Sequence, residues 1–209
     1  MKLNEQFESV AQEMETLDTV IREQGLPDEV RARWGVTNNP GTWCVGRKTA
    51  EFLFQQVLTK RPKLVLELGT SIGYSTIWLA AAAKEVGGEV ATVEKETYKM
   101  EMADEFIVRS GMSPVVRQIQ GDISDVLDGW EEPVDFVFID AGKRGYLSSL
   151  KKLEPWLNEG AVIIADNMTD MQKQVQDYID YVTTDEKYHS TLIDIDHGLM
   201  ISIYKKTTA

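Results

Sequence analysis

Cysteine and long apolar runs are scarce in this sequence, and each scarcity excludes a class of protein. Cys44 is the single cysteine among 209 residues, so the chain cannot form an internal disulfide, which fits a reducing compartment. No segment reaches the length of a membrane span, and residues 1–20 are too polar for a signal peptide. We therefore expect a cytoplasmic protein with no membrane partner.

Positive charge is also in short supply. The chain has 22 lysines and arginines against 34 aspartates and glutamates, which gives a net charge of −12. A surface of that sign repels polyanions, so it argues against non-specific binding to nucleic acid or to an anionic membrane. A local basic patch from Lys143, Arg144, Lys151 and Lys152 would be an exception to that argument.

The first segment is amphipathic. Its apolar residues recur at alternating spacings of four and three, which predicts a helix over residues 1–24. These residues are Leu3, Phe7, Val10, Met14, Leu17 and Ile21. Such a stripe packs either on its own domain or on a second copy of the chain, so a homodimer stays open.

From Lys63 onward, short apolar runs alternate with helical patterns. This alternation predicts an α/β fold with a doubly wound, mostly parallel sheet and helices on both faces. The runs "STLIDI" and "LMISIYK" are separated only by residues 196–198, so they must form an antiparallel C-terminal hairpin. We expect one domain over residues 1–209.

Ligands of such sheets bind beyond the C-terminal ends of the strands, so the residues that end each strand matter most. The first strand leads into "ELGTSIGYS", whose Gly69 and Gly73 allow a tight turn but do not match a dinucleotide or P-loop motif. This turn has no basic phosphate clamp and includes Glu67, which favours a ligand with a cationic group. Glu94 ends the second strand, where an acid can accept hydrogen bonds from ribose hydroxyls.

The third strand leads to Asp122 and Ile123. Asp122 could accept from the exocyclic amine of a base while Ile123 packs on its ring, although an aspartate there is also an ordinary helix N-cap. Taken alone, each of these acids at a strand end could have a purely structural role. Their occurrence at successive strand ends predicts a nucleoside site.

The fourth and fifth strands end in hard-oxygen ligands. Asp140 follows one strand, and Asp166 with Asn167 follows the next, which suits Mg²⁺ or a similar cation. Turn and capping roles for Asp166 and Asn167 are the alternative. Lys143 lies three residues past Asp140 and could take a proton from a cation-bound hydroxyl as a general base.

These segments resemble a known family. "LVLELGTSIGYSTIWLA", "TVEKE", "GDISDVL", "FVFIDAGKRGY" and "IIADN" are similar to motifs of the cation-dependent O-methyltransferases, which include catechol and caffeoyl-CoA O-methyltransferases and small bacterial enzymes. The resemblance covers residues 43–205. It implies the Rossmann-like, seven-stranded fold of the class I S-adenosylmethionine-dependent methyltransferases, with a reversed last strand.

The resemblance also implies roles for single residues. Glu94 would hold the ribose of S-adenosylmethionine, Asp122 with Ile123 the adenine, and Trp43 would lie near the acceptor. Lys143 would be the catalytic base. The remaining cofactor-binding residues would be Val45, Gly46, Glu67, Gly69, Thr70, Gly73, Ser75 and Asp140, and the ligands of a divalent cation, most simply Mg²⁺, would be Asp140, Asp166 and Asn167.

The predicted activity is O-methylation of a small acceptor with two adjacent hydroxyls, such as a catechol. A hydroxylated nucleoside in tRNA is an alternative acceptor, and a non-catalytic S-adenosylmethionine-binding protein is an alternative class. Thr169 and Gln172 have capping-box spacing, which predicts a helix almost directly after Asn167 and leaves little chain for a lid over the acceptor. We expect Cys44 to be an unreactive packing thiol and His197 to be a hairpin residue, with contact to the substrate as the alternative for His197.

Overall fold

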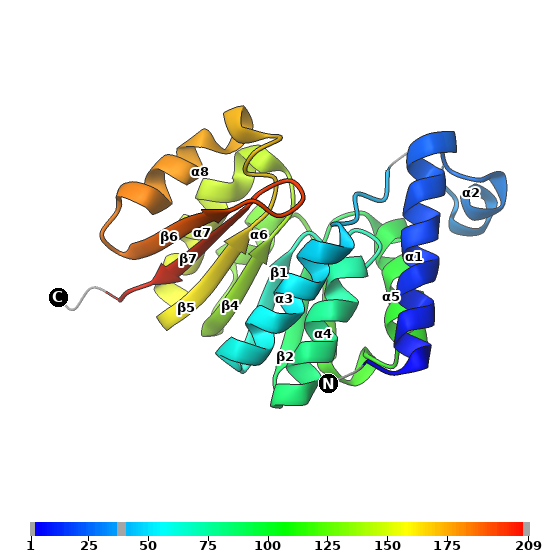
Figure 1. The fold of residues 1–209 in the computed structure, drawn as a ribbon, viewed down its shortest axis with the longest axis horizontal. Helices are drawn as coiled ribbons and strands as arrows, with labels where there is room; N and C mark the ends of the chain where they lie inside the picture. The colour runs from blue at the N-terminus through cyan, green and yellow to red at the C-terminus, as the bar shows by residue number, and fades with distance from the viewer. Residues whose placement is uncertain (1–2, 37–40, 207–209) are drawn as a thin grey trace.

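The molecule is built on one seven-stranded sheet (Figure 1), and the computed structural model describes residues 3–36 and 41–206. The strand order is β3-β2-β1-β4-β5-β7-β6. Successive strands are added on one side of β1 up to β3 and on its other side from β4 onward, so the strand order reverses between β1 and β4. The strands are β1 Leu64–Leu68, β2 Glu89–Glu94, β3 Val116–Gln120, β4 Val134–Ile139, β5 Leu157–Ala165, β6 Tyr188–Ile193 and β7 Leu199–Tyr204. The predicted seven-stranded α/β fold is confirmed.

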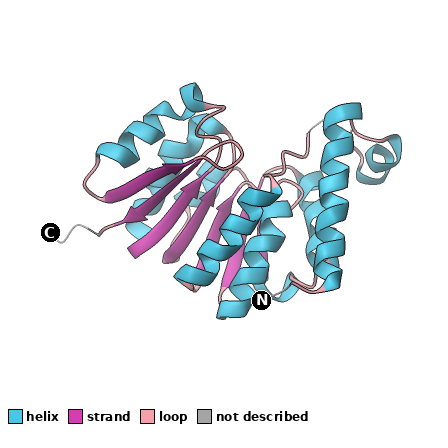
Figure 2. Cartoon of the chain, in the orientation of Figure 1, coloured by secondary structure: helices cyan, strands magenta, loops and turns pink. Residues whose placement is uncertain are grey.

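The central strands are apolar because both of their faces are covered. Every residue of β1 is buried, and so are five of the six residues of β4. Helices lie on the two faces of the sheet (Figure 2). One layer contains α1 Glu5–Gln24, α3 Arg47–Lys60, α4 Tyr74–Val86 and α5 Thr97–Arg109, and the other contains α6 Ile123–Asp128, α7 Tyr146–Leu153 and α8 Gln172–Thr184.

Short elements lie between these helices and strands. They are the helix α2 Asp28–Trp34 and the single 3₁₀ turns η1 Ser113–Val115, η2 Lys143–Gly145 and η3 Glu154–Trp156. β1 to β5 are parallel, whereas β7 is antiparallel to both β5 and β6. The predicted C-terminal hairpin is therefore confirmed.

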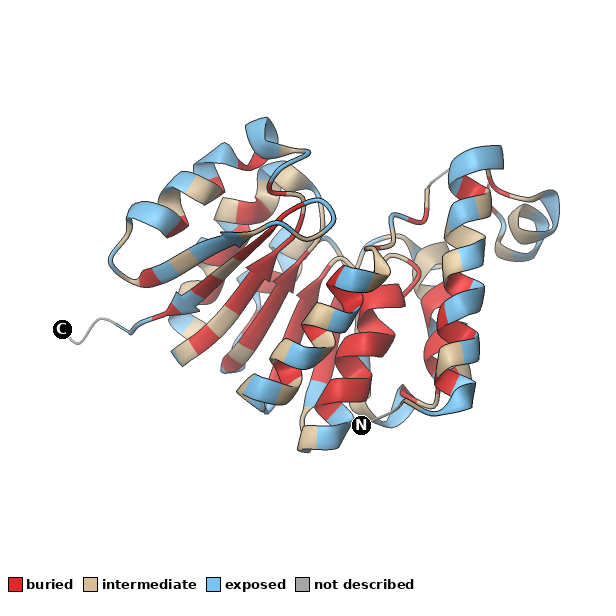
Figure 3. Cartoon of the chain, in the orientation of Figure 1, coloured by how far each residue is buried: buried red, intermediate tan, exposed pale blue. Residues whose placement is uncertain are grey.

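The N-terminal stripe packs on its own chain. Phe7, Val10 and Met14 of α1 are buried in the core cluster that also holds α4 and α5, as the burial colouring of α1 indicates (Figure 3). Glu13 of α1 forms an ion pair with Arg109 of α5. Of the two placements predicted for the stripe, the structure has the intramolecular one, and residues 1–2 of the predicted helix lie outside the described residues. In the described part of the chain, no helix is long and apolar enough to cross a membrane.

The segment after β5 departs from prediction. α8 begins at Gln172 with Met171 as its N-cap, and no side chain caps it. The Thr169 hydroxyl instead donates to the His197 carbonyl oxygen at 2.7 Å, and the Thr169 amide donates to the same oxygen at 3.0 Å. The predicted capping box is therefore wrong, because Thr169 is used to bind the tip of the β6–β7 hairpin.

Candidate functional site

A cavity of about 1000 Å³ opens at the C-terminal ends of β1, β2, β4 and β5, where the strand order reverses. Gly69 makes this geometry available. Its φ is 107°, and a Cβ added there would lie 2.1 Å from the Asp140 carbonyl oxygen, so only glycine lets the β1 turn pass so close to the end of β4. The predicted residues that line the cavity are Gly69, Thr70, Ser75, Glu94, Asp122, Ile123, Asp140, Lys143, Asp166 and Asn167.

Glu94 is held in place by backbone amides. Its Oε2 accepts from the Ser71 amide at 2.9 Å, and its Oε1 accepts from the amides of Lys95 and Glu96 at 3.0 and 3.1 Å. The Ser71 contact ties the glycine turn to the end of β2. Because a carboxylate has about four acceptor positions, Oε2 keeps capacity for a ligand hydroxyl.

Asp122 is the N-cap of helix α6, which was the alternative role predicted for it. Its Oδ1 accepts from the Ser124 amide at 2.9 Å as the N-cap of α6. Asp122 and Ile123 both line the cavity, and they follow β3, the strand that pairs with the Glu94 strand β2. The cap fixes the carboxylate, and Oδ2 is the atom that could accept from a base amine.

Glu67 lies beneath the cavity floor. Its side chain is fully buried and is not among the cavity-lining residues. Hydroxyls of Ser75, Thr76 and Thr92 donate to it at 2.6, 2.5 and 2.6 Å. Burial raises the pKa of Glu67 to about 7, against the lowering effect of these hydroxyls. Ser75 reaches the cavity and so connects Glu67 to it, but the structure gives Glu67 no direct face toward a ligand.

Three further predicted residues, Val45, Gly46 and Gly73, lie behind the cavity wall and do not line it. Gly46 has a structural reason to be glycine, since an added Cβ would lie 2.3 Å from the Asp196 carboxylate that caps α3. Gly73 has a φ of 88°, and an added Cβ would lie 3.1 Å from Ala103. Packing at Gly46 and the turn conformation at Gly73 explain why these two positions are glycine.

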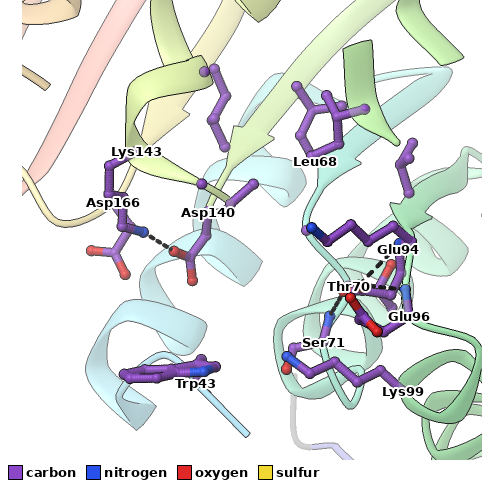
Figure 4. A pocket seen from close by; sticks show the side chains of 18 of the residues that line it. Trp43, Leu68, Thr70, Ser71, Glu94, Glu96, Lys99, Asp140, Lys143 and Asp166 are labelled. Atoms are coloured by element: carbon purple, nitrogen blue, oxygen red, sulfur yellow. Dashed lines mark hydrogen bonds and ion pairs between the residues drawn. The ribbon is translucent and has the colours of Figure 1, made fainter. Parts of the chain in front are cut away.

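Asp140, Asp166 and Asn167 converge on the opposite side of the cavity from Glu94 (Figure 4 shows the two aspartates). Asp166 is 3% exposed, and burial together with the charge of Asp140 raises its pKa to about 7. Asn167 has a φ of 67°, and its Nδ2 lies 3.2 Å from Asp170 Oδ2, which leaves its Oδ1 as a ligand atom.

These residues fit a cation. The charge of Asp140 raises the proton affinity of the buried Asp166, so a positive charge between the two carboxylates would stabilise them. Among the described residues no three His, Cys, Asp or Glu side chains gather as a metal group, and the predicted set instead joins two carboxylates to the Asn167 amide. The donor set is oxygen only, which suits Mg²⁺ better than a soft metal.

Lys143 is the positive charge next to these acids. Its Nζ donates to Asp140 Oδ1 at 2.7 Å and to the Tyr146 hydroxyl at 2.9 Å. Tyr146 is 1% exposed and packs edge-on against Tyr178, with ring centroids 5.8 Å apart. The ammonium group is thus held between a rigid buried phenol and a carboxylate.

Trp43 and Cys44 line the cavity, and Trp43 lies across from the two aspartates (Figure 4). Trp43 is 67% exposed and has a φ of 48°, an uncommon conformation for a large side chain. Burial, followed by the charge of Asp18, raises the pKa of the Cys44 thiol well above its usual range. That thiol stays protonated at neutral pH, in keeping with the prediction that it is unreactive.

Sequence reasoning missed several lining residues. Ser71 and Tyr146 both line the cavity. His197, which was predicted at the hairpin with a possible substrate contact, lines it too, and its Nδ1 lies 3.4 Å from Asp170 Oδ2. Tyr146 lies one helical turn from Lys143, a spacing that could have indicated it. Ser71 gave no such signal, because its position depends on the conformation of the turn after β1.

The comparisons with known proteins agree with this geometry. Residues 66–168 match a family model described as a methyltransferase domain. The chain is 35% identical over 121 residues to a catechol O-methyltransferase of Niastella koreensis, covering 55% of this chain and 54% of that one. It is 34% identical over 126 residues to a catechol O-methyltransferase of Mycobacterium tuberculosis, covering 60% of this chain and 57% of that one.

Solved structures show the same fold. An O-methyltransferase from Bacillus cereus in complex with SAH matches with a TM-score of 0.73 at 24% identity, over 91% of this chain and 97% of that one. The chain spans a little over half the length of the curated relatives named above. The chain is thus similar to O-methyltransferases, catechol O-methyltransferases among them, as the sequence motifs predicted, and the fold is that of the methyltransferases.

Proposed function

We propose that the protein is an S-adenosylmethionine-dependent, divalent-cation-dependent O-methyltransferase whose acceptor is a small molecule with two adjacent hydroxyls. The observation that supports this most is the meeting of two groups in one cavity. Glu94 lies on one side, with Asp122 following the neighbouring strand β3, and Asp140, Asp166 and Lys143 lie on the other side. A methyl donor and a hydroxyl acceptor would be held face to face by such an arrangement.

S-adenosylmethionine as the donor is supported by the structure neighbour that contains SAH and by the chemistry of the first side. Glu94, fixed by three backbone amides, would accept from the ribose hydroxyls. Asp122 and Ile123 would hold the adenine. The acidic character of the cavity suits a cationic sulfonium ligand rather than a phosphate-bearing one.

The second side supports acceptor activation. A divalent cation held by Asp140, Asp166 and Asn167 would lower the pKa of an acceptor hydroxyl. Lys143 Nζ, 2.7 Å from Asp140, would take the hydroxyl proton, and the positive charge of a neighbouring cation favours the neutral amine that a base requires. The acceptor oxygen then forms a bond to the methyl carbon while the carbon–sulfur bond breaks and its electron pair stays on sulfur.

The alternatives receive less support. A tRNA acceptor would need basic residues free to bind phosphate, but Lys152 lies 2.6 Å from Asp128 and Lys151 lies 4.8 Å from the centre of the Tyr181 ring. A non-catalytic binding protein would not need Lys143 next to two buried acids. The names of the curated relatives also favour a catechol-like acceptor over both.

The direct test is methyl transfer from S-adenosylmethionine to a panel of catechols and to bulk tRNA, each with Mg²⁺ and with EDTA. Transfer to catechols that EDTA abolishes and Mg²⁺ restores is the expected result. Transfer to tRNA alone would reassign the acceptor. Tight SAH binding with no transfer to any catechol or to tRNA would favour the non-catalytic alternative.

A further inference from the structure

The C-terminal end of α1 is bonded to the cavity wall. Asp18 accepts from the Thr42 hydroxyl through Oδ1, and the same oxygen lies 3.3 Å from the Cys44 amide. Arg22, one turn later, pairs with Asp18 Oδ2 at 2.6 Å and donates to the Cys44 carbonyl oxygen at 2.8 Å. The backbone on both sides of Trp43 is therefore fastened to one acid–base pair of the N-terminal helix.

The contacts continue from this wall to the cofactor side. The Thr42 carbonyl oxygen accepts from the Ser71 hydroxyl, and the Ser71 amide donates to Glu94 Oε2 at 2.9 Å. Thr42 is 2% exposed, so its polar atoms have no water to replace a lost partner. An unbroken series of hydrogen bonds runs from Asp18 through Thr42 and Ser71 to Glu94.

Ser71 in this series, and Trp43 next to Thr42, have left-handed backbones without being glycine. Trp43 has a φ of 48° and Ser71 a φ of 47°. Such conformations cost free energy and persist only where surrounding bonds hold them. Here the holding bonds are those made by Asp18, Arg22 and Glu94.

We propose that Asp18 is a positioning residue of the cofactor site, acting through Thr42 and Ser71 on Glu94 and through Cys44 on Trp43. This inference rests on the proposed function and extends it. α1 then does more than complete the core, because its docked state fixes the loops on which the donor and the acceptor would lie. The methyl-donor pocket is formed only when α1 is in place.

Other contacts of α1 supply a matched control. Glu13, on the same helix, pairs with Arg109 of α5 through two nitrogens and has no contact with the cavity wall. Removing Glu13 or Asp18 loses one ion pair of α1 in each case. Only Asp18→Ala also frees residues 42–44.

The test measures amide hydrogen exchange over residues 41–45 and 69–74 in the full chain, and SAH affinity by calorimetry. In Asp18→Ala we expect faster exchange in both segments and SAH affinity weaker by about 10-fold, from lost charge-assisted hydrogen bonds. Asp18→Asn keeps an acceptor for Thr42 and Cys44, so it should restore affinity to within about 3-fold of the wild type. Glu13→Ala should change neither exchange in these segments nor affinity.

Equal effects of Glu13→Ala and Asp18→Ala would overturn the proposal, and so would unchanged exchange in a folded Asp18→Ala protein. Thr42→Val, which removes only the hydroxyl donor, gives the same test if Asp18→Ala fails to fold. If the wild type does not bind SAH at all, the proposed function fails instead. The exchange measurement then still decides whether Asp18 orders the two loops, because it needs no ligand.

Discussion

Lys143 Nζ lies 2.7 Å from Asp140 Oδ1, in the first turn after β4 ends. The buried hydroxyl of Tyr146, 2.9 Å from the same nitrogen, fixes the amine from the other side. A base candidate and a cation-ligand candidate are thus in contact within one short turn. Asp140 contacts the Lys143 amine in this structure, and in the proposed reaction it would also bind the divalent cation.

Lys143→Ala should lower kcat for a catechol by about 10²–10⁴-fold with little change in SAH affinity, because proton removal is lost while the Glu94 side is untouched. The loss should shrink at high pH, where hydroxide can remove the acceptor proton. Steady-state kinetics across a pH series with Mg²⁺ present checks this.

Arg144→Ala is the matched control for that experiment, since Arg144 is an exposed cation in the same turn. It should keep the wild-type kcat. A loss in Lys143→Ala that stays the same size at every pH would instead make Lys143 a positioning charge.

The cation site gives a second prediction. Asp140→Asn and Asp166→Asn should each abolish Mg²⁺-dependent turnover, because each removes a charged oxygen ligand. For Asp166→Asn, SAH affinity should stay within about 3-fold of the wild type, since Glu94 lies on the other side of the cavity. Calorimetric titration with Mn²⁺ gives a readout that does not depend on activity.

Asp194→Asn, an exposed acid in the segment before the hairpin tip, is the control and should bind Mn²⁺ like the wild type. The oxygen-ligand assignment would be wrong if EDTA-treated wild type turned over as fast as the Mg²⁺-loaded protein.

The features that sequence predicted best depend on local pattern or on strand ends. The buried run Phe136–Ile139 had to be a central strand, and parallel strands bring their carboxyl ends to one edge, so Asp140 and Asp166 had to approach each other. Gly69 was singled out as a turn residue, and the structure explains it by the close passage of the Asp140 carbonyl.

Other features could not be predicted because they depend on long-range packing. Glu67 was predicted as a ligand residue because it precedes the glycine turn. Its side chain instead lies beneath the cavity floor, where it accepts hydrogen bonds from Thr76 and Thr92. Thr169 had capping-box spacing, but the hairpin tip competes for its hydroxyl. The Asp18–Thr42 bond joins residues 24 apart across segments with no shared motif.

Glu67 gives a pH prediction. Its pKa is raised from 4.5 to about 7 in the folded protein by burial. The folded state therefore holds this proton more tightly than the unfolded state does. The stabilisation is fully present below about pH 4.5 and is lost as pH rises through about 7, by on the order of 3 kcal/mol in total.

Glu67→Gln should remove that loss. The glutamine amide can donate its two hydrogens to the Thr76 and Thr92 hydroxyls, which now donate to Glu67 Oε2, so the network stays paired. Urea unfolding at pH 5 and pH 8 should show the variant gaining stability relative to the wild type at the higher pH. A difference between the two proteins that does not change with pH would show that Glu67 ionises normally in the fold.

The last prediction concerns the acceptor. Trp43 is 67% exposed on the wall opposite Asp140 and Asp166, and its ring packs over Gly41, where an added Cβ would lie 2.7 Å from the indole. A planar acceptor whose oxygens reach the cation could lie against this ring. α8 begins at Gln172, five residues after Asn167, so this segment supplies little chain that could enclose the acceptor. With few enclosing side chains, binding energy from remote acceptor groups is small.

We therefore expect several catechols to be methylated with similar, weak KM values, and compounds with one hydroxyl to be poor acceptors because they offer the cation a single oxygen. Trp43→Ala should raise KM for catechols by about 10-fold with little change in SAH affinity, whereas Trp43→Phe keeps a planar face and should stay near the wild type. Competition assays with a catechol series and its single-hydroxyl analogues check both points. If the full-length protein rejects every simple catechol but methylates one elaborate acceptor tightly, the acceptor site is closed by contacts that Trp43 does not provide.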